Sequence, residues 1–539
     1  MGSVSSSLLT PGGSGGPLVG TMFVLTVSLV LLLLSTVVGH RNGLLDQSPI
    51  LSTTNSISPQ QKAQLQQVAD LMLDIYQILV DMRYLDPVGI IRGPHNMTAL
   101  EPQFDELNID PSVRYLYGIL PYVDTDAAGN TYFMRDSVFM DFRDPYQVED
   151  SRDPFNVSPP SDGDFNAKDG PYMHPWYTPL TQLENNGRVI IYDARRHLIW
   201  IIDQEGWWTT DLALRDIEPK DGETSNQNSF EHIPSRPAGE VLKEIVQWYR
   251  NLYIVPGGGE YSLQEWDHYK VPLRDLYIAN GWPDRFDADA FEVSQARAFS
   301  RSVAQDFADR PLSEVARLEE VIERNKHWIE TQTAILGWST TKEGEWAARS
   351  RIRSTEIAVA KFEEDLIVAQ QKAEQECPEN VCLPPQEWPL WELQAVTETV
   401  ERLKTDIAFA ESQIKLEPFE GQDLDEWQEY VQRWKNKNHL MKRKLAVYQK
   451  AYEAAREDVE RLCPGQTFES VTGLTEMGWF VRTKEDIRRI LVHKQNELEL
   501  TRQWYAQLPH DVPDTRSKIE KDIQSLEEGM QFWEEILSE

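Results

Sequence analysis

The chain has 539 residues, with 53 Lys and Arg against 87 Asp and Glu, so its formal net charge at pH 7 is -34. Such an excess of negative charge repels nucleic-acid phosphates and anionic lipid headgroups. We identify no local basic patch that would offset it, so nucleic acid is not an expected partner. A hydrophobic share of 40% with 17 Trp, 19 Tyr and 18 Phe argues against a disordered chain.

The N-terminus contains the one segment that is long and apolar enough to enter a membrane. Residues 1–17 are rich in Ser and Gly and predict a disordered leader. Residues 18–38 are uncharged and mostly apolar, which predicts a transmembrane helix or a signal segment, followed by a linker over 39–57. Cleavage is left open, because the small residues around Gly39 suit a signal peptidase but the usual basic region before the apolar run is missing.

The topology of such a segment is also left open by the sequence. Arg41 follows the apolar run, and by the positive-inside rule it would hold the following side in the cytoplasm. The sequons Asn96-Met-Thr and Asn156-Val-Ser are instead glycosylation acceptors if the main body enters the secretory lumen. We expect a single-pass membrane protein, with a secreted or lumenal protein as the alternative.

Residues 58–305 predict an α+β domain. A helix should start at Pro59, because proline is favoured in the first helical turn. Residues 188–192 and 198–202 are β-branched and aromatic runs separated by a polar turn, which predicts a hairpin. Their continuous apolar character indicates strands that are covered on both faces. Helical periodicity returns at 238–250.

Residues 306–539 predict a mainly α-helical bundle with antiparallel coiled-coil helices, so that the chain is predominantly helical overall. The clearest evidence is a seam of apolar residues at three- and four-residue spacing over 393–462. Its members include Leu393, Val396, Val400, Leu403, Ile407, Trp427, Val431, Trp434, Met441, Leu445, Tyr448 and Leu462. Such a seam specifies helix pairing, within the chain or in a homo-oligomer, and indicates no catalytic activity.

Three cysteines are too few for a disulfide framework. Cys377 and Cys382 are a candidate disulfide that would close a short loop, and Cys463 would stay free. A disulfide requires an oxidising compartment, and reduced thiols are the equal alternative. The spacing lacks the second Cys or His pair of a zinc site, so no metal is expected.

The chain contains only weak candidates for catalytic residues, and no cofactor is expected. The glycines at 257–259 are not followed by the Lys and Ser or Thr of a phosphate loop. Asp193, Asp203, Glu205 and Asp211 flank the predicted hairpin near two tryptophans. Paired carboxylates divide acid and base roles in glycosidases, and tryptophan suits a sugar face. The competing interpretation is that these acids only end strands.

Several segments resemble a group of uncharacterised filamentous-fungal proteins. The resemblance rests on residues 242–253, on Val-Pro-Gly-Gly-Gly at 255–259 and on Asn-Gly-Trp-Pro-Asp at 280–284. Residues 81–86 and 151–154 are similar to the same group, so that the resemblance extends over roughly 60–300. It implies no known activity, cofactor or site residue.

The sequence therefore favours a membrane-anchored interaction or scaffold protein, whose coiled-coil helices bind a protein partner or a second copy. The alternatives are a secreted or lumenal enzyme that acts on glycans, and a secreted binding module with a cleaved signal peptide. Whether the protein is an enzyme stays open.

Overall fold

The computed structural model separates residues Met1–Asn55 from a second unit, Ser56–Glu539. It describes residues 57–134, 137–152, 173–182, 188–203, 208–214, 217, 229–256, 271–336, 342–418, 423–477, 484–507 and 513–538. The predicted leader and the 18–38 segment lie outside these residues. In the described ranges, no helix combines the length and the apolar character that crossing a bilayer requires.

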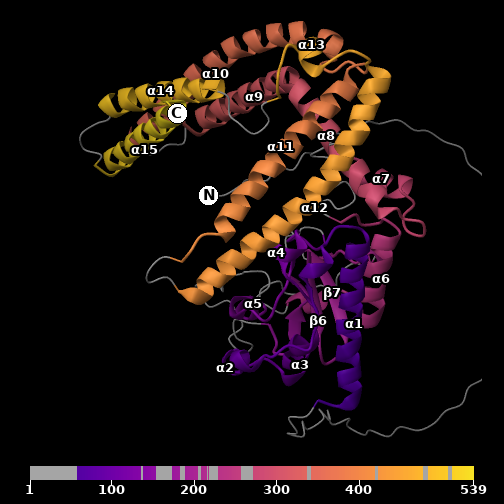
Figure 1. The fold of residues 1–539 in the computed structure, drawn as a ribbon. Helices are drawn as coiled ribbons and strands as arrows, with labels where there is room; N and C mark the ends of the chain where they lie inside the picture. The colour runs from indigo at the N-terminus through magenta and orange to yellow at the C-terminus, as the bar shows by residue number, and fades with distance from the viewer. Residues whose placement is uncertain are drawn as a thin grey trace, which may run out of the picture. The chain divides into compact units, whose positions relative to one another are not determined.

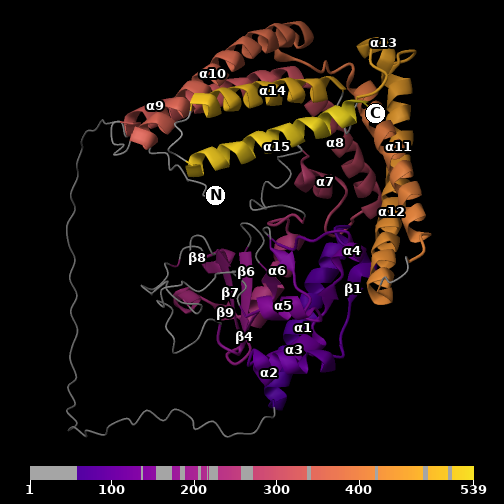
Figure 2. The same ribbon diagram turned by 90° about the vertical axis from the view of Figure 1, so that its left-hand side faces the viewer.

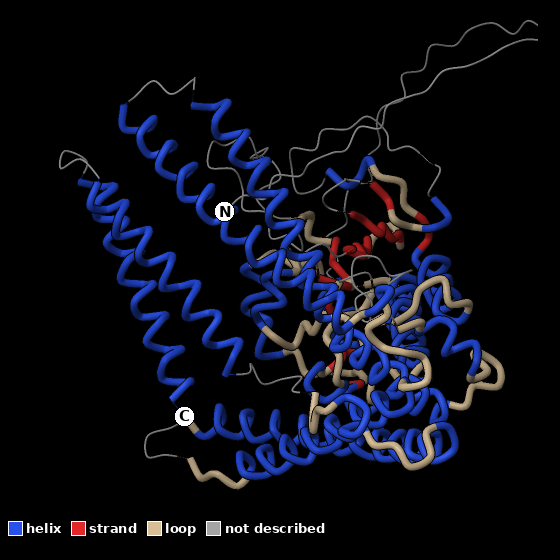
Figure 3. The backbone as a smooth tube through the Cα atoms, turned by 90° about the horizontal axis from the view of Figure 1, so that it is seen from above, coloured by secondary structure: helices blue, strands red, loops and turns tan. Residues whose placement is uncertain are grey.

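The fold class is confirmed. A mixed region with small antiparallel sheets, over about residues 90–250, is followed by a mainly helical region, and 70% of the structure is helical. Figure 3 shows the strands gathered in one part of the chain, apart from the long paired helices. The strands lie where the apolar residues form short continuous runs, and the long helices lie where apolar residues repeat at three- and four-residue spacing.

The main sheet is built on the predicted hairpin, β6 (Arg188–Asp193) and β7 (Leu198–Asp203). The two strands are antiparallel, with Ile190 opposite Ile201. Strand β4 (Tyr177–Pro179) pairs with β6, while β8 (Trp208–Thr209) and β9 (Arg236–Pro237) pair with opposite ends of β7. Two separate ladders join β1 (Ile90–Ile91) to β2 (Tyr122–Val123) and β3 (Val138–Phe139) to β5 (Thr181–Gln182).

The hairpin is covered on both faces, as its continuous apolar character predicts. Alternate side chains of a strand point to opposite faces of a sheet. Ile190, Tyr192, Ile199 and Ile201 belong to the large core that the helices of this region share. Val189, Ile191, Trp200 and Ile202 belong to a second, smaller core with Phe230 and Ile233. The residues of both sets are at most 2% exposed.

Helices cover the larger of these two cores. Helix α1 (Pro59–Asp81) begins at Ser58, whose side chain accepts a hydrogen bond from the Gln61 backbone N–H at 3.1 Å. It packs against α3 (Pro111–Ile119) and α6 (Ala238–Arg250), and Figure 1 shows α1 and α6 beside the hairpin. The other helices of this region are α2 (Glu101–Glu106), α4 (Thr125–Ala128), α5 (Pro145–Asp150) and α7 (Leu273–Ala279).

The remaining helices are mostly long and lie in pairs. They are α8 (Ala288–Ala308), α9 (Arg310–Leu336), α10 (Lys342–Glu376), α11 (Trp388–Ile414), α12 (Leu424–Leu462), α13 (Phe468–Thr472), α14 (Lys484–Gln507) and α15 (Pro513–Ser538). Helices α9 and α10, α11 and α12, and α14 and α15 pack against each other, and Figures 1 and 2 show each pair side by side. Most of the seam over 393–462 is therefore the contact between α11 and α12, but its last member, Leu462, is 55% exposed, so the expectation that it is covered is wrong.

Helix α8 packs against this seam along part of its length. Ala296 of α8 lies in a buried cluster with Val396 and Val400 of α11 and with Tyr448 and Ala451 of α12. Toward the N-terminus of α12 the seam is less covered, and Trp427, Val431 and Trp434 are only partly buried. Helices α11 and α12 thus form a hairpin with one end packed against α8 and the other end left more open.

Candidate functional site

Each acidic candidate that the structure describes is bound to an arginine. The Asp193 carboxylate lies 2.5 Å from Arg196 Nε and accepts hydrogen bonds from the turn backbone. Asp203 pairs with Arg188 of the neighbouring strand at 3.1 Å. Asp193, Asp203 and the third candidate, Asp211, are at most 5% exposed. Glu205 lies outside the described residues.

Asp211 belongs to a separate ion cluster. Arg236 Nε lies 2.7 Å from Asp211, and Arg236 Nη2 lies 2.7 Å from Glu244 of α6. The hydrogen bond to Arg236 lowers the pKa of Glu244, and the two carboxylates in turn raise the pKa of Arg236. This cluster holds β9 and α6 to the segment after β8.

The spacing of Asp193 and Asp203 does not suit paired acid and base catalysis. Asp193 faces Leu198 in the β6–β7 ladder, whereas Asp203 ends β7 beside Arg188. The five steps from 198 to 203 correspond to about 17 Å along a strand. Glycosidase carboxylates lie roughly 5 to 9.5 Å apart. These aspartates therefore end strands and neutralise arginines, which is the competing interpretation given above.

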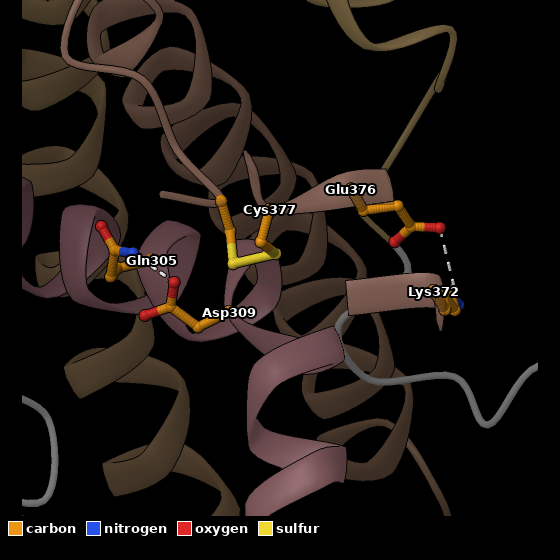
Figure 4. Close-up of a disulfide and its surroundings, with 6 residues drawn as sticks. Gln305, Asp309, Lys372, Glu376 and Cys377 are labelled. Carbon is orange, nitrogen blue, oxygen red and sulfur yellow. Dashed lines mark hydrogen bonds and ion pairs between the residues drawn. A yellow bond between two sulfur atoms is a disulfide. The ribbon is translucent and has the colours of Figure 1, made fainter. Parts of the chain in front are cut away.

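The structure joins Cys377 and Cys382 in a disulfide at the turn between α10 and α11. Figure 4 shows the bond beside the last turn of α8, where Gln305 donates a hydrogen bond to Asp309 at 2.6 Å. Cys377 is buried, and Cys463 is a buried free thiol. Within the described ranges, no three histidine, cysteine or acidic side chains gather in a way that could hold a metal ion.

The described sequon lies in an exposed turn. Asn96 and Thr98 are both exposed, and the Thr98 hydroxyl donates to Asn96 Oδ1 at 2.7 Å. The Thr98 backbone N–H donates to the same oxygen at 3.1 Å. Nothing in the described structure covers the asparagine side chain, so a glycan has room there. Asn156 lies outside the described residues.

Four aromatic rings lie at the less covered end of the α11–α12 hairpin, where α11 ends and α12 begins. Phe409 of α11 packs edge-on against Trp434 of α12 at a centroid distance of 5.5 Å. Trp427 stacks on Tyr430 at 5.2 Å, and Tyr430 also contacts Trp434. Phe409 is nevertheless 56% exposed, and the other three rings are only partly buried. Large aromatic residues are usually buried in a folded chain.

Positive charges lie on the same part of α12 as three of these rings. Arg433, Lys435 and Lys437 are exposed, and in the described part of the chain no carboxylate pairs with any of them. The Lys437 ammonium lies 4.9 Å from the centre of the Trp434 ring. We refer to the four rings and these three cations as the α11–α12 end surface. It combines aromatic rings with cations, although the first turns of α12 also carry the exposed carboxylates of Asp425, Glu426 and Glu429.

The interpretation that the sequence has no local basic patch is wrong at this helix. From Tyr430 to Tyr452 the chain contains no Asp or Glu, while it contains Arg433, Lys435, Lys437, Lys442, Arg443, Lys444 and Lys450. The large excess of acids elsewhere hides this run in a count over the whole chain. A count over windows of about two dozen residues reveals it.

Comparison of the chain with protein families, with curated proteins and with solved structures finds no match. The function must therefore be argued from the described side chains.

Proposed function

We propose that this is a membrane-anchored interaction or scaffold protein that binds an acidic helical segment of a partner protein through the α11–α12 end surface. The observation that carries the proposal is that Phe409 and Trp434 remain accessible on a hairpin end where Arg433, Lys435 and Lys437 are exposed and, in the described residues, have no carboxylate partner. Tryptophan, tyrosine and arginine are the residues that most often dominate binding energy at protein interfaces.

The charge of the surface restricts the choice of partner. A partner with carboxylates beside apolar side chains would pair the three cations and cover the rings in one step. Such complementarity also accelerates encounter and disfavours partners of the wrong charge. Because the rest of the chain is strongly acidic, an acidic partner is repelled elsewhere and directed to this surface.

The anchor and the compartment are part of the same proposal. Residues 18–38 are the proposed membrane segment, which is supported by their uncharged apolar composition. The Cys377–Cys382 disulfide and the exposed sequon at Asn96 both support a body in the oxidising lumen of the secretory pathway. A secreted protein with a cleaved signal is the alternative, and it would appear in the medium without residues 18–38.

Photo-cross-linking in cells tests the partner surface. A photoreactive residue replaces Trp434 in the full-length chain, and a matched control replaces Gln449, which is exposed further along the same helix. We expect cross-links from position 434 to acidic helical peptides of a second protein, and none from position 449. The double change Lys435→Glu and Lys437→Glu should abolish them, because it repels the same carboxylates.

Two outcomes would contradict the proposed partner. Cross-links that survive the double charge reversal would mean that the cations do not select the partner. Cross-links to a second copy of this chain would show that the surface mediates self-association and does not bind an acidic partner. Carbonate extraction of the same cells tests the anchor, since a retained segment resists extraction and a chain without residues 18–38 does not.

A further inference from the structure

A cleft of about 350 Å³ lies where α4, α7, α8 and α12 meet. One part of its wall is apolar and is formed by Leu273, Phe299, Leu440 and Val447, from three of these helices. A volume of this size lies within the range of small-molecule sites, which are mostly apolar with a few charged groups. None of the acidic candidates from the sequence lines this cleft.

An ion cluster fixes one side of the cleft. Arg443 of α12 reaches Asp86 with Nη1 at 2.9 Å and Glu292 of α8 with Nη2 at 2.7 Å. His439 Nε2 also lies 3.5 Å from Asp86. Arg443 therefore pairs with both carboxylates of the cleft and balances one of their two charges, and it ties α12 both to α8 and to the segment after α1.

The backbone beside this cluster leaves little room for movement. Gly129, just after α4, has φ +88°, and a Cβ at that position would lie 3.3 Å from the Leu440 side chain. Glycine thus allows α12 to approach α4 closely. With the ion cluster on one side and this close contact on the other, the wall is formed before any ligand arrives.

Lys444 is a cation of the cleft without a carboxylate partner in the described part of the chain. The cleft is lined by three cations, Arg83, Arg443 and Lys444, against the two carboxylates of Asp86 and Glu292. Arg443 forms ion pairs with both of those carboxylates, and Arg83 forms a longer ion pair of 3.5 Å with Asp289. In the described chain no carboxylate pairs with Lys444, whose ammonium lies 5.9 Å from the Tyr448 ring centre. Lys444 is therefore the lining cation that no described carboxylate holds, and it lies next to an apolar wall.

We infer that this cleft binds a small monoanion with a compact apolar body, such as an aromatic carboxylate. The carboxylate pairs with Lys444, and the apolar body packs on Leu440, Val447 and Phe299. A dianion or a sugar is a poorer fit, because a second charge would face Asp86 and Glu292 and a sugar would leave hydroxyls against apolar side chains. The site is independent of the α11–α12 end surface and of the proposed partner.

Calorimetric titration with naphthoate, and with uncharged naphthol as its matched control, tests this site. The full-length chain is held in lipid nanodiscs, with empty discs as the reference. We expect naphthoate to bind about tenfold more tightly than naphthol, the effect of one charge-assisted contact. Lys444→Met should remove this preference. Lys435→Met, which removes a cation of the same helix outside the cleft, should keep it.

A second variant tests the location. Gln295 lines the cleft from α8 and is partly buried, so Gln295→Trp should fill the space and abolish binding of both ligands. Circular dichroism and hydrogen exchange of α8 report whether this variant stays folded. The inference is overturned by wild-type protein that binds neither ligand, by equal affinity for both, or by an undiminished preference in Lys444→Met. Binding that survives in a folded Gln295→Trp variant also overturns it.

Discussion

Replacing Arg443 with methionine should loosen α12 from both of its neighbours. The change leaves Asp86, whose side chain is 6% exposed, and Glu292, whose side chain is 17% exposed, without their guanidinium partner. Removing one member of a buried ion pair costs about 3 to 5 kcal/mol. Because the Arg443 side chain is itself 29% exposed, solvent screening reduces the expected cost to about 2 kcal/mol.

The pH dependence of this loss follows from Asp86. Burial opposes its ionisation, but the hydrogen bond from the Val88 N–H and the pair with Arg443 outweigh burial, so the pKa of Asp86 is lowered. A lowered pKa contributes stability above the unfolded value of about 3.9, and this contribution is lost as pH falls through the folded pKa. The deficit of Arg443→Met should therefore be largest at neutral pH and should shrink below about pH 4.

Hydrogen exchange of the α12 amides at pH 7 and at about pH 2.5, below the unfolded pKa of Asp86, measures this local opening energy. Arg433→Met is the matched control, because Arg433 lies on the same helix without an ion pair in the described chain and should cost less than about 0.5 kcal/mol. Equal protection of α12 in Arg443→Met and wild type at pH 7 would refute the reasoning. An equal deficit at both pH values would show that lost packing, rather than the charge on Asp86, causes the effect.

Three further predictions concern other parts of the chain. Cys377→Ser opens the loop closed with Cys382 and should lower stability by about 2 kcal/mol, seen as a lower thermal midpoint; no change would mean that the thiols are reduced in the wild type. Gly281→Ala should cost about 2 kcal/mol in chemical denaturation, because Gly281 has φ +86° and a Cβ would meet the Arg285 carbonyl oxygen at 2.3 Å. Asn96→Gln should reduce the endoglycosidase-sensitive gel shift of a lumenal body, and a wild type without any shift would contradict that topology.

The elements that could be predicted are those with a strong local pattern. Two continuous apolar runs that flank a polar turn predict the hairpin at 188–193 and 198–203 to within one residue. Apolar residues that repeat at helical spacing over 238–250 likewise predict helix α6. Two-residue strands such as β1 have no pattern of their own, since the pairing partner defines them.

Helix α14 lies in the segment 306–539 that is predicted to be helical, but no apolar seam identifies it as a separate helix, for a different physical reason. It pairs with α15, and Ile487 and Leu498 are its buried apolar residues among those described. A helix that contacts a single partner needs only a narrow apolar stripe, and the dense charges around that stripe obscure it.

The candidate site was harder to predict than the fold. Asp193 and Asp203 are predicted to lie together because both flank the hairpin in the sequence. The antiparallel pairing of β6 and β7 instead places them at opposite ends of the hairpin. The partner of Asp211 is Arg236, which comes from a later strand, so the ion pair depends on tertiary structure. The cleft likewise combines side chains as distant in sequence as Asp86 and Arg443.

The two-sided burial of the β6–β7 hairpin limits how the chain can change during evolution. A shift of one residue in the pairing of β7 would exchange the faces of Ile201 and Ile202, and with them every side chain of the strand. Both cores would lose their fit at once, because each takes alternate residues of the same strand. A single-residue insertion within β7 is therefore far less tolerable than any single substitution there, and homologous chains should keep the length of this strand even where its residues differ.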